Sequence, residues 1–166
     1  MPHISLRPRT LEHVKIFWEA SQDAEIAQLI PLSRVSLDEA IAGYEACQKP
    51  DARSFGQVIY ADGAYVGDVW CYAIDEDEEK QAFVSIVIFD KGHWGRGIGR
   101  QALAQFYALV FQRYRIGKLC AFTYRSNQRS IRALEGVGFG MVEEFEEEGV
   151  PSCYFELAAP PPSLSV

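Results

Sequence analysis

Hydrophobic and polar positions follow two different periods along the chain. Short runs rich in Val, Ile, Phe and Tyr, bounded by turn residues, are typical of strands, and apolar residues spaced by three and four are typical of helices. Strands are predicted at 4–9, 54–60, 64–74, 81–89, 118–124, 141–148 and 152–158. Helices are predicted at 10–21, from 36, from the end of a loop at 90–99 to about 117, and from 127. This order predicts an α/β (α+β) fold with a mixed sheet.

Capping residues support several of these boundaries. Thr10 precedes the first helix, and Ser36 with Glu39 has the form of a capping box. Asn127 is placed to cap the last helix, which Gly136 and Gly138 close, and "ADG" at 61–63 forms a turn between two strands.

The composition is that of an ordinary globular domain. Of the 166 residues 48% are hydrophobic and 23% are charged, so we expect one domain at 1–158 and a flexible, Pro-rich tail at 159–166. No apolar run approaches the roughly 20 residues of a membrane span, and the N-terminus lacks the apolar core of a signal peptide. The four cysteines have no metal-ligand or redox spacing. We therefore expect a cytoplasmic protein with reduced thiols, no bound metal and no membrane contact.

Charge is distributed unevenly. The net charge of −7 argues against nucleic acid as a partner. Residues 91–132 nevertheless hold nine of the 16 Lys and Arg residues and no Asp or Glu. An anionic ligand bound in this segment would have cationic surroundings.

This basic segment begins with a glycine-rich loop, "DKGHWGRGIG" (90–99), between a predicted strand and a predicted helix. Unshielded N–H groups at the positive end of a helix dipole favour an anion. A Walker-type loop requires Lys and Ser or Thr after its last glycine, but Ile98 and Gly99 follow Gly97. A dinucleotide fingerprint lacks its third glycine, because Arg100 and Ala102 stand in its place.

Two motifs identify a third candidate. "HWGRGIGRQAL" (93–103) resembles the acyl-CoA loop of the GNAT superfamily of N-acetyltransferases, with Gly97 and Gly99 at its two glycines and Trp94 where Gln or Arg is usual. "NQRSIRALEGVGF" (127–139) resembles a second motif of the subgroup related to the ribosomal-protein N-terminal acetyltransferases (RimJ/RimL-like). The resemblance covers about residues 4–158 and implies the GNAT fold, a mixed, mostly antiparallel sheet of about seven strands with helices on both faces.

The resemblance also implies a reaction and a cofactor site. It implies that acetyl-CoA donates an acetyl group to a primary amine, either a protein N-terminus or a small amine, which attacks the thioester directly. A catalytically silent acyl-CoA-binding or sensor domain is the alternative. The residues expected to hold the cofactor are Ile88, Phe89, Trp94, Gly95, Arg96, Gly97, Ile98, Gly99, Arg100 and Asn127.

The catalytic and acceptor residues are less clearly marked. Many relatives use a Tyr on the last helix as the acid, but Leu134 occupies that position, so Ser130 and Tyr124 are the candidates. Asp68, Glu143 and Glu144 are candidates for the base. The acidic run "EEFEEE" (143–148) suggests that Glu144 and Glu146 attract a cationic acceptor. The expected assembly is a monomer or a homodimer.

Overall fold

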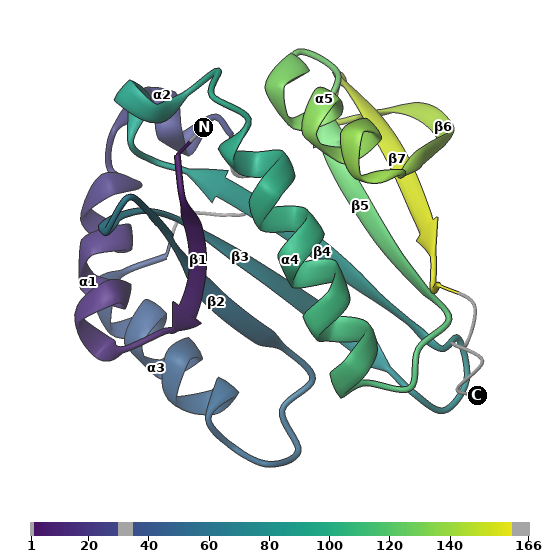
Figure 1. Cartoon of the computed structure of the whole chain (residues 1–166), viewed down its shortest axis with the longest axis horizontal. Coiled ribbons are helices and arrows are strands. Elements are labelled where there is room, and N and C mark those ends of the chain that lie inside the picture. The colour runs from purple at the N-terminus through teal and green to yellow at the C-terminus, as the bar shows by residue number, and fades with distance from the viewer. Residues whose placement is uncertain (1, 30–34, 161–166) are drawn as a thin grey trace.

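A seven-stranded sheet organises the part of the chain that the computed structural model describes, residues 2–29 and 35–160 (Figure 1). The strands are β1 (Ile4–Pro8), β2 (Phe55–Ala61), β3 (Ala64–Asp75), β4 (Gln81–Ile88), β5 (Lys118–Tyr124), β6 (Gly140–Glu147) and β7 (Val150–Ala158). The helices are α1 (Leu11–Ala20), α2 (Ala24–Ala27), α3 (Leu37–Cys47), α4 (Ile98–Arg113) and α5 (Gln128–Val137), and a 3₁₀ turn, η1, covers Lys91–His93.

The strands lie in the order β1-β2-β3-β4-β5-β7-β6, and every neighbouring pair is antiparallel except β4 and β5. These two strands pair only between residues 81–83 and residues 118–120. Because β4 continues to Ile88 and β5 to Tyr124, the two strands separate beyond this short ladder. The sheet is therefore open between the carboxyl ends of β4 and β5.

Alternation along the strands directs side chains to two helical layers. Val69 and Cys71 of β3 are buried in the core cluster that includes Phe106 of α4. Trp70 lies between them in sequence and so points to the opposite face, where its ring meets Phe17 of α1 edge-to-face at 6.1 Å. Helices thus cover both faces of the mixed sheet, and the predicted fold class is confirmed.

The predicted caps are confirmed in detail. The Thr10 side chain caps α1, Ser36 and Glu39 form the capping box of α3, and the Asn127 side chain accepts from the N–H of Ser130. Gly138 ends α5 in the left-handed conformation, with φ 117°, whereas Gly136, which was also expected to close the helix, lies inside it.

The structure adds two short elements to those predicted. The four residues of α2 and the three of η1 are too few to produce a helical period, so only their caps, Asp23 and Asp90, could have signalled them. At the other end, the N–H of Ala159 donates to the carbonyl of Gly117 at 2.8 Å, so this first residue of the expected tail is tied to the sheet. Residues 161–166 of that tail lie outside the described residues.

Two features of the described ranges bear on function. Within residues 2–29 and 35–160, no helix has the length and apolar content needed to cross a membrane. The same residues bring no three His, Cys, Asp or Glu side chains together as a metal site would require.

Candidate active site

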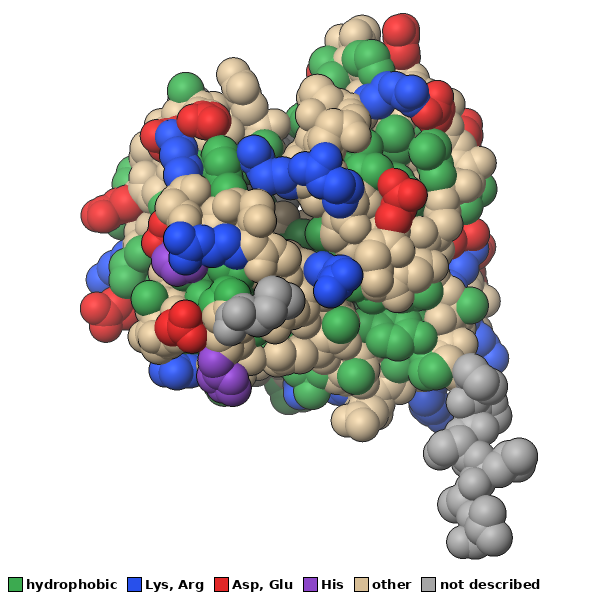
Figure 2. All heavy atoms as spheres, turned by 45° about the horizontal axis from the view of Figure 1, so that its top comes forward, with side chains coloured by type: hydrophobic (Ala, Val, Ile, Leu, Met, Phe, Trp, Pro, Cys, Tyr) green, Lys and Arg blue, Asp and Glu red, His purple; other side chains and the backbone are tan. Residues whose placement is uncertain are grey.

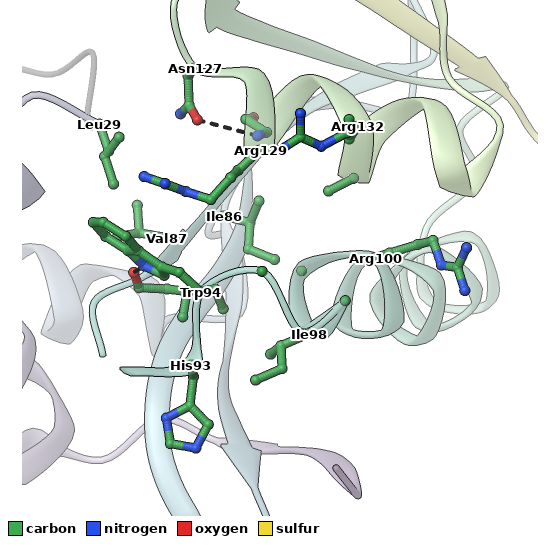
Figure 3. Close-up of a pocket in the computed structure, with 16 residues that line it drawn as sticks. Leu29, Ile86, Val87, His93, Trp94, Ile98, Arg100, Asn127, Arg129 and Arg132 are labelled. Atoms are coloured by element: carbon green, nitrogen blue, oxygen red, sulfur yellow. Dashed lines mark hydrogen bonds between the residues drawn. The ribbon is translucent and has the colours of Figure 1, made fainter. Parts of the chain in front are cut away.

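A cavity of about 370 Å³ lies at the carboxyl end of β4, where the sheet is open. Its walls are the strand end, the loop before α4, and the first turns of α4 and α5 (Figure 3). The lining residues are Leu29, Ile86, Val87, Ile88, His93, Trp94, Gly95, Gly97, Ile98, Gly99, Arg100, Asn127, Arg129, Ser130, Arg132 and Ala133.

The amino end of α4 opens into this cavity. Gly97 is its N-cap residue, with φ 73°, a left-handed conformation that glycine adopts without steric cost, and it makes no side-chain cap. The first N–H groups of a helix have no intrahelical partner, and they carry the positive end of the helix dipole. Gly97, Ile98, Gly99 and Arg100 all line the cavity. The geometry is that of an anion site, as the glycine loop predicted.

Trp94 links the loop to the strand on one side and to α5 on the other. Its indole N–H donates to the carbonyl of Ile88 at 2.7 Å, which holds the loop against the end of β4. The Arg129 guanidinium lies over the same ring, 3.8 Å from its centroid, as Figure 3 shows. The stacked pair therefore joins α5 to the loop at the wall of the cavity, which explains a Trp at this position.

Some basic residues of the 91–132 segment form ion pairs, and others line the cavity. Lys91 lies 3.0 Å from a carboxylate oxygen of Asp23 and 2.9 Å from one of Glu25, and this contact lowers the pKa of Asp23. Arg125 pairs with Glu144, and Lys118 with Glu156. Three arginines from the segment line the cavity instead, namely Arg100, Arg129 and Arg132. Figure 2 shows Lys and Arg side chains gathered around a hollow in the surface.

A second, narrow cavity continues from the first into the gap between β4 and β5. Its volume of about 30 Å³ holds on the order of one or two water molecules. Ile86 and Ala121 line it from the α4 face of the sheet, while Trp70 and Phe122 line it from the opposite face. Both cavities share Leu29, Ile86, Val87, Asn127 and Ser130. We call these two adjoining cavities, whose lining residues lie on both faces of the sheet, the passage.

Most residues predicted to hold the cofactor meet at this passage. Ile88, Trp94, Gly95, Gly97, Ile98, Gly99, Arg100 and Asn127 line the large cavity, and Phe89 and Arg96 do not. Phe89 packs edge-to-face against Phe17 and Tyr65, and its N–H donates to the carbonyl of Val66 at 3.0 Å. Arg96 is exposed in the loop.

The two catalytic candidates lie in different surroundings. Ser130 lines both cavities, on the first turn of α5. Tyr124 is half-buried at the end of β5 and lines neither cavity. The geometry therefore favours Ser130 over Tyr124 as the group closest to the passage.

The acidic residues predicted to attract the acceptor lie away from the passage. Glu144 is opposite Cys153 of β7, a core residue, so it shares the α5 face of the sheet and pairs there with Arg125. Glu146 is two residues further along the same face. Neither lines either of these two cavities, and their contact with an acceptor stays a prediction.

Asp68, one candidate for the base, is enclosed in a network of its own. It is 1% exposed, its carboxylate lies 2.7 Å from the Arg9 guanidinium, and it accepts from the Tyr65 hydroxyl. Burial raises the pKa of Asp68, while Arg9 opposes that rise. Asp68 lines neither cavity, so its environment is that of a structural ion pair.

Several cavity residues were not singled out from the sequence. Arg129 and Arg132 belong to the basic segment, and their spacing of three places both on one side of α5. That spacing was the available signal. Leu29, Ile86 and Val87 are apolar residues that only the separation of β4 and β5 brings to a cavity.

The fold and the site define a class: a protein with a mixed sheet that is open between two parallel strands and an uncapped helix end that faces a cavity. Residues 3–140 match the family described as "Acetyltransferase (GNAT) domain". The chain therefore belongs to the GNAT acetyltransferases, as its two motifs indicated, and acetyl-CoA is the co-substrate.

Solved structures of three acetyltransferases resemble most of the chain. Spermidine N-acetyltransferase from Vibrio cholerae, in complex with CoA and spermine, has a TM-score of 0.81 at 17% identity, over 94% of this chain and 95% of that one. RimJ from Mycobacterium smegmatis, in complex with CoA-disulfide, has 0.80 at 18% identity, over 94% and 82%. Aminoglycoside acetyltransferase AAC(6')-Ib, in complex with coenzyme A, has 0.78 at 17%, over 94% and 95%. At these identities the likenesses show a common fold.

Proposed function

We propose that this protein transfers the acetyl group of acetyl-CoA to a primary amine by direct attack of the amine on the thioester. The observation that carries the proposal is the pair of adjoining cavities, one at the uncapped end of α4 and the other lined from both faces of the sheet. The pyrophosphate of coenzyme A would lie against the N–H groups of the 94–100 loop, near Arg129 and Arg132. The pantetheine arm would then run along the end of β4 toward the narrow cavity.

Ser130 is the group we propose for the sulfur end. When a neutral amine attacks the carbonyl carbon, a C–N bond forms, the C–S bond breaks, and the departing thiolate requires a proton or a hydrogen-bond donor. Ser130 lies where the two cavities meet, and Leu134 beside it cannot donate. Losing one such interaction costs on the order of 2–4 kcal/mol in the transition state.

The Ser130→Ala variant tests this role. We expect its kcat to fall by roughly 30-fold or more, while the Kd for coenzyme A changes little. Ser126→Ala, an exposed serine in the loop before α5, is the matched control. Tyr124→Phe tests the second candidate in the same assay. A Ser130→Ala enzyme with wild-type kcat, where chemistry limits the rate, would remove Ser130 from the mechanism.

The function itself is tested by the release of free thiol from acetyl-CoA across a panel of primary amines. If acetyl-CoA binds but releases no free thiol in the presence of any of these amines, the silent acyl-CoA-binding domain is favoured. The cofactor position is tested by Gly99→Val, since Gly99 lines the cavity and a Cβ there would lie 3.5 Å from the Cβ of Ala133, an ordinary contact. We expect weaker coenzyme A binding than in Gly43→Val, a change at a helical glycine with nothing within 4 Å.

The sequence also predicts the subgroup of the protein, its cellular location and its oligomeric state. The second motif supports a RimJ/RimL-like enzyme, and we retain a cytoplasmic monomer or homodimer as the prediction from sequence. Protein N-termini and small amines are both in the amine panel, so the panel separates the subgroup from small-amine enzymes.

A further inference from the structure

Five aromatic side chains form a row across the sheet on the face opposite α4. Tyr72 stacks on Phe83 at 5.7 Å, and Phe83 stacks on Phe122 at 5.4 Å with an interplanar angle of 9°. Phe122 also meets Tyr154 at 5.0 Å and Phe145 edge-to-face at 5.8 Å. The row thus crosses β3, β4, β5, β7 and β6 without interruption, and we call it the aromatic row.

The aromatic row is not part of the hydrophobic core. Phe122 is 42% exposed, although its neighbours in β5, Ala121 and Thr123, are 2% and 6% exposed. Phe83, Tyr154 and Phe145 are half-buried. One face of β5 is therefore buried, while Phe122 on the other face is accessible to solvent or to a ligand.

The narrow cavity adjoins the centre of the aromatic row. Phe122 and Trp70 line the narrow cavity from this face, and Ser130 and Leu134 line it from the α5 side. An amine that approaches the thioester through the gap between β4 and β5 therefore passes Phe122. The group that carries the amine would lie on the aromatic row while the nitrogen reaches the narrow cavity.

The β6 carboxylates on this face lie at one end of the row rather than at its centre. Glu143 lies opposite Tyr154 and thus shares this face, two residues from Phe145. Glu156 is already engaged, because it accepts from Tyr154 at 2.7 Å and from Lys118 at 2.6 Å. Glu143 and Glu147 flank Phe145 at the β6 end of the row, so the centre of the row at Phe122 is apolar, and a flat ring matches the stacked side chains there.

We propose that the aromatic row, with Phe122 at its centre, binds the acceptor and that the acceptor is a small primary amine bearing an aromatic ring. This inference rests on the acetyltransferase function proposed above. The row supplies stacking and apolar contact to the ring, and it leaves the amine nitrogen at the gap in the sheet. The amine loses a proton on forming the amide, and the thiolate of coenzyme A gains one.

The test compares 2-phenylethylamine with butylamine and spermidine, each at equal concentration of neutral amine. We expect kcat/KM for 2-phenylethylamine to exceed that for butylamine by about tenfold, since its ring adds stacking and buried apolar area. Phe122→Ala should reduce this ratio by roughly two- to tenfold with no change in the KM for acetyl-CoA. Phe122→Leu, which keeps apolar volume, separates stacking from a general loss of packing.

Met141→Ala is the matched control, because Met141 is 49% exposed and lies opposite Phe155 on the other face of the sheet. Equal kcat/KM for the ring-bearing and alkyl amines, a preference for spermidine, or a ratio unaffected by Phe122→Ala would overturn the inference while leaving acetyl transfer intact. If no amine is acetylated, the proposed function fails. In that case, calorimetry on the protein saturated with coenzyme A tests the inference. Equal affinities for 2-phenylethylamine and butylamine would overturn it.

Discussion

Gly67 offers a direct test of how the sheet positions the cofactor site. It lies in β3 opposite Ile88, the last residue of β4, and the two backbones approach closely. A Cβ at Gly67 would lie 3.0 Å from both Cα and Cδ1 of Ile88, and closer still to the carbonyl oxygen of Val87. These neighbours are mostly backbone, so Gly67→Ala must displace the end of β4.

The displacement has two measurable consequences. Backbone shifts of this kind cost about 1–3 kcal/mol of unfolding free energy, which for a domain of this size corresponds to a fall in Tm of roughly 2–12 °C. In addition, the Ile88 carbonyl accepts the Trp94 indole N–H at 2.7 Å, so moving Ile88 also moves the loop of the anion site. We therefore expect the KM for acetyl-CoA to rise while the acceptor KM changes less.

Urea unfolding and steady-state kinetics measure these two effects separately. Gly43→Ala in α3 is the control, because nothing lies within 4 Å of its added Cβ, and it should raise stability by up to about 1 kcal/mol. A Gly67→Ala protein with wild-type stability and wild-type KM for acetyl-CoA would refute the close approach of β3 and β4 as the constraint on this site.

Three further changes test neighbouring features. Gly136→Ala places a Cβ 2.5 Å from Cδ of Arg100; the flexible side chain should move aside, so we expect unchanged or higher Tm and a modest rise in acetyl-CoA KM, and a large loss of stability would contradict this. Arg129→Ala should raise the acetyl-CoA KM several-fold, less so at high salt, whereas Arg129→Lys keeps the charge without the planar stack on Trp94; equal KM values in all three proteins would exclude the role. Burial lowers the pKa of His13 below its usual value, with Arg9 and Arg7 contributing and Glu12 opposing. The unfolded chain then binds a proton more readily, so stability should fall as pH falls below about 6.5, and a His13→Gln protein with the same pH dependence of urea midpoint would show that His13 is not responsible.

Local sequence signals were sufficient for most of the fold. Thr10, Ser36 and Asn127 cap the helices that their positions predicted, because a cap depends on hydrogen bonds within three residues. The strands alternate as their apolar pattern indicated. The glycine loop and the second motif also identified the family. The uncapped start of α4 could be predicted because unshielded N–H groups at a helix start depend on the local sequence.

Only the tertiary structure determined the passage and the face that an acceptor would meet. The ladder between β4 and β5 ends at Phe83, so the two strands separate beyond it. That separation brings Ile86, Val87 and Ser130 to one cavity. Likewise, the alternation of "EEFEEE" was evident from the sequence, but the pairing with β7 decides which residues lie on which face. Phe145 belongs to the aromatic row and Glu143 lies on the same face, whereas Glu144 lies on the other face. Register between strands distant in sequence depends on long-range packing and turns, so no local pattern specifies it.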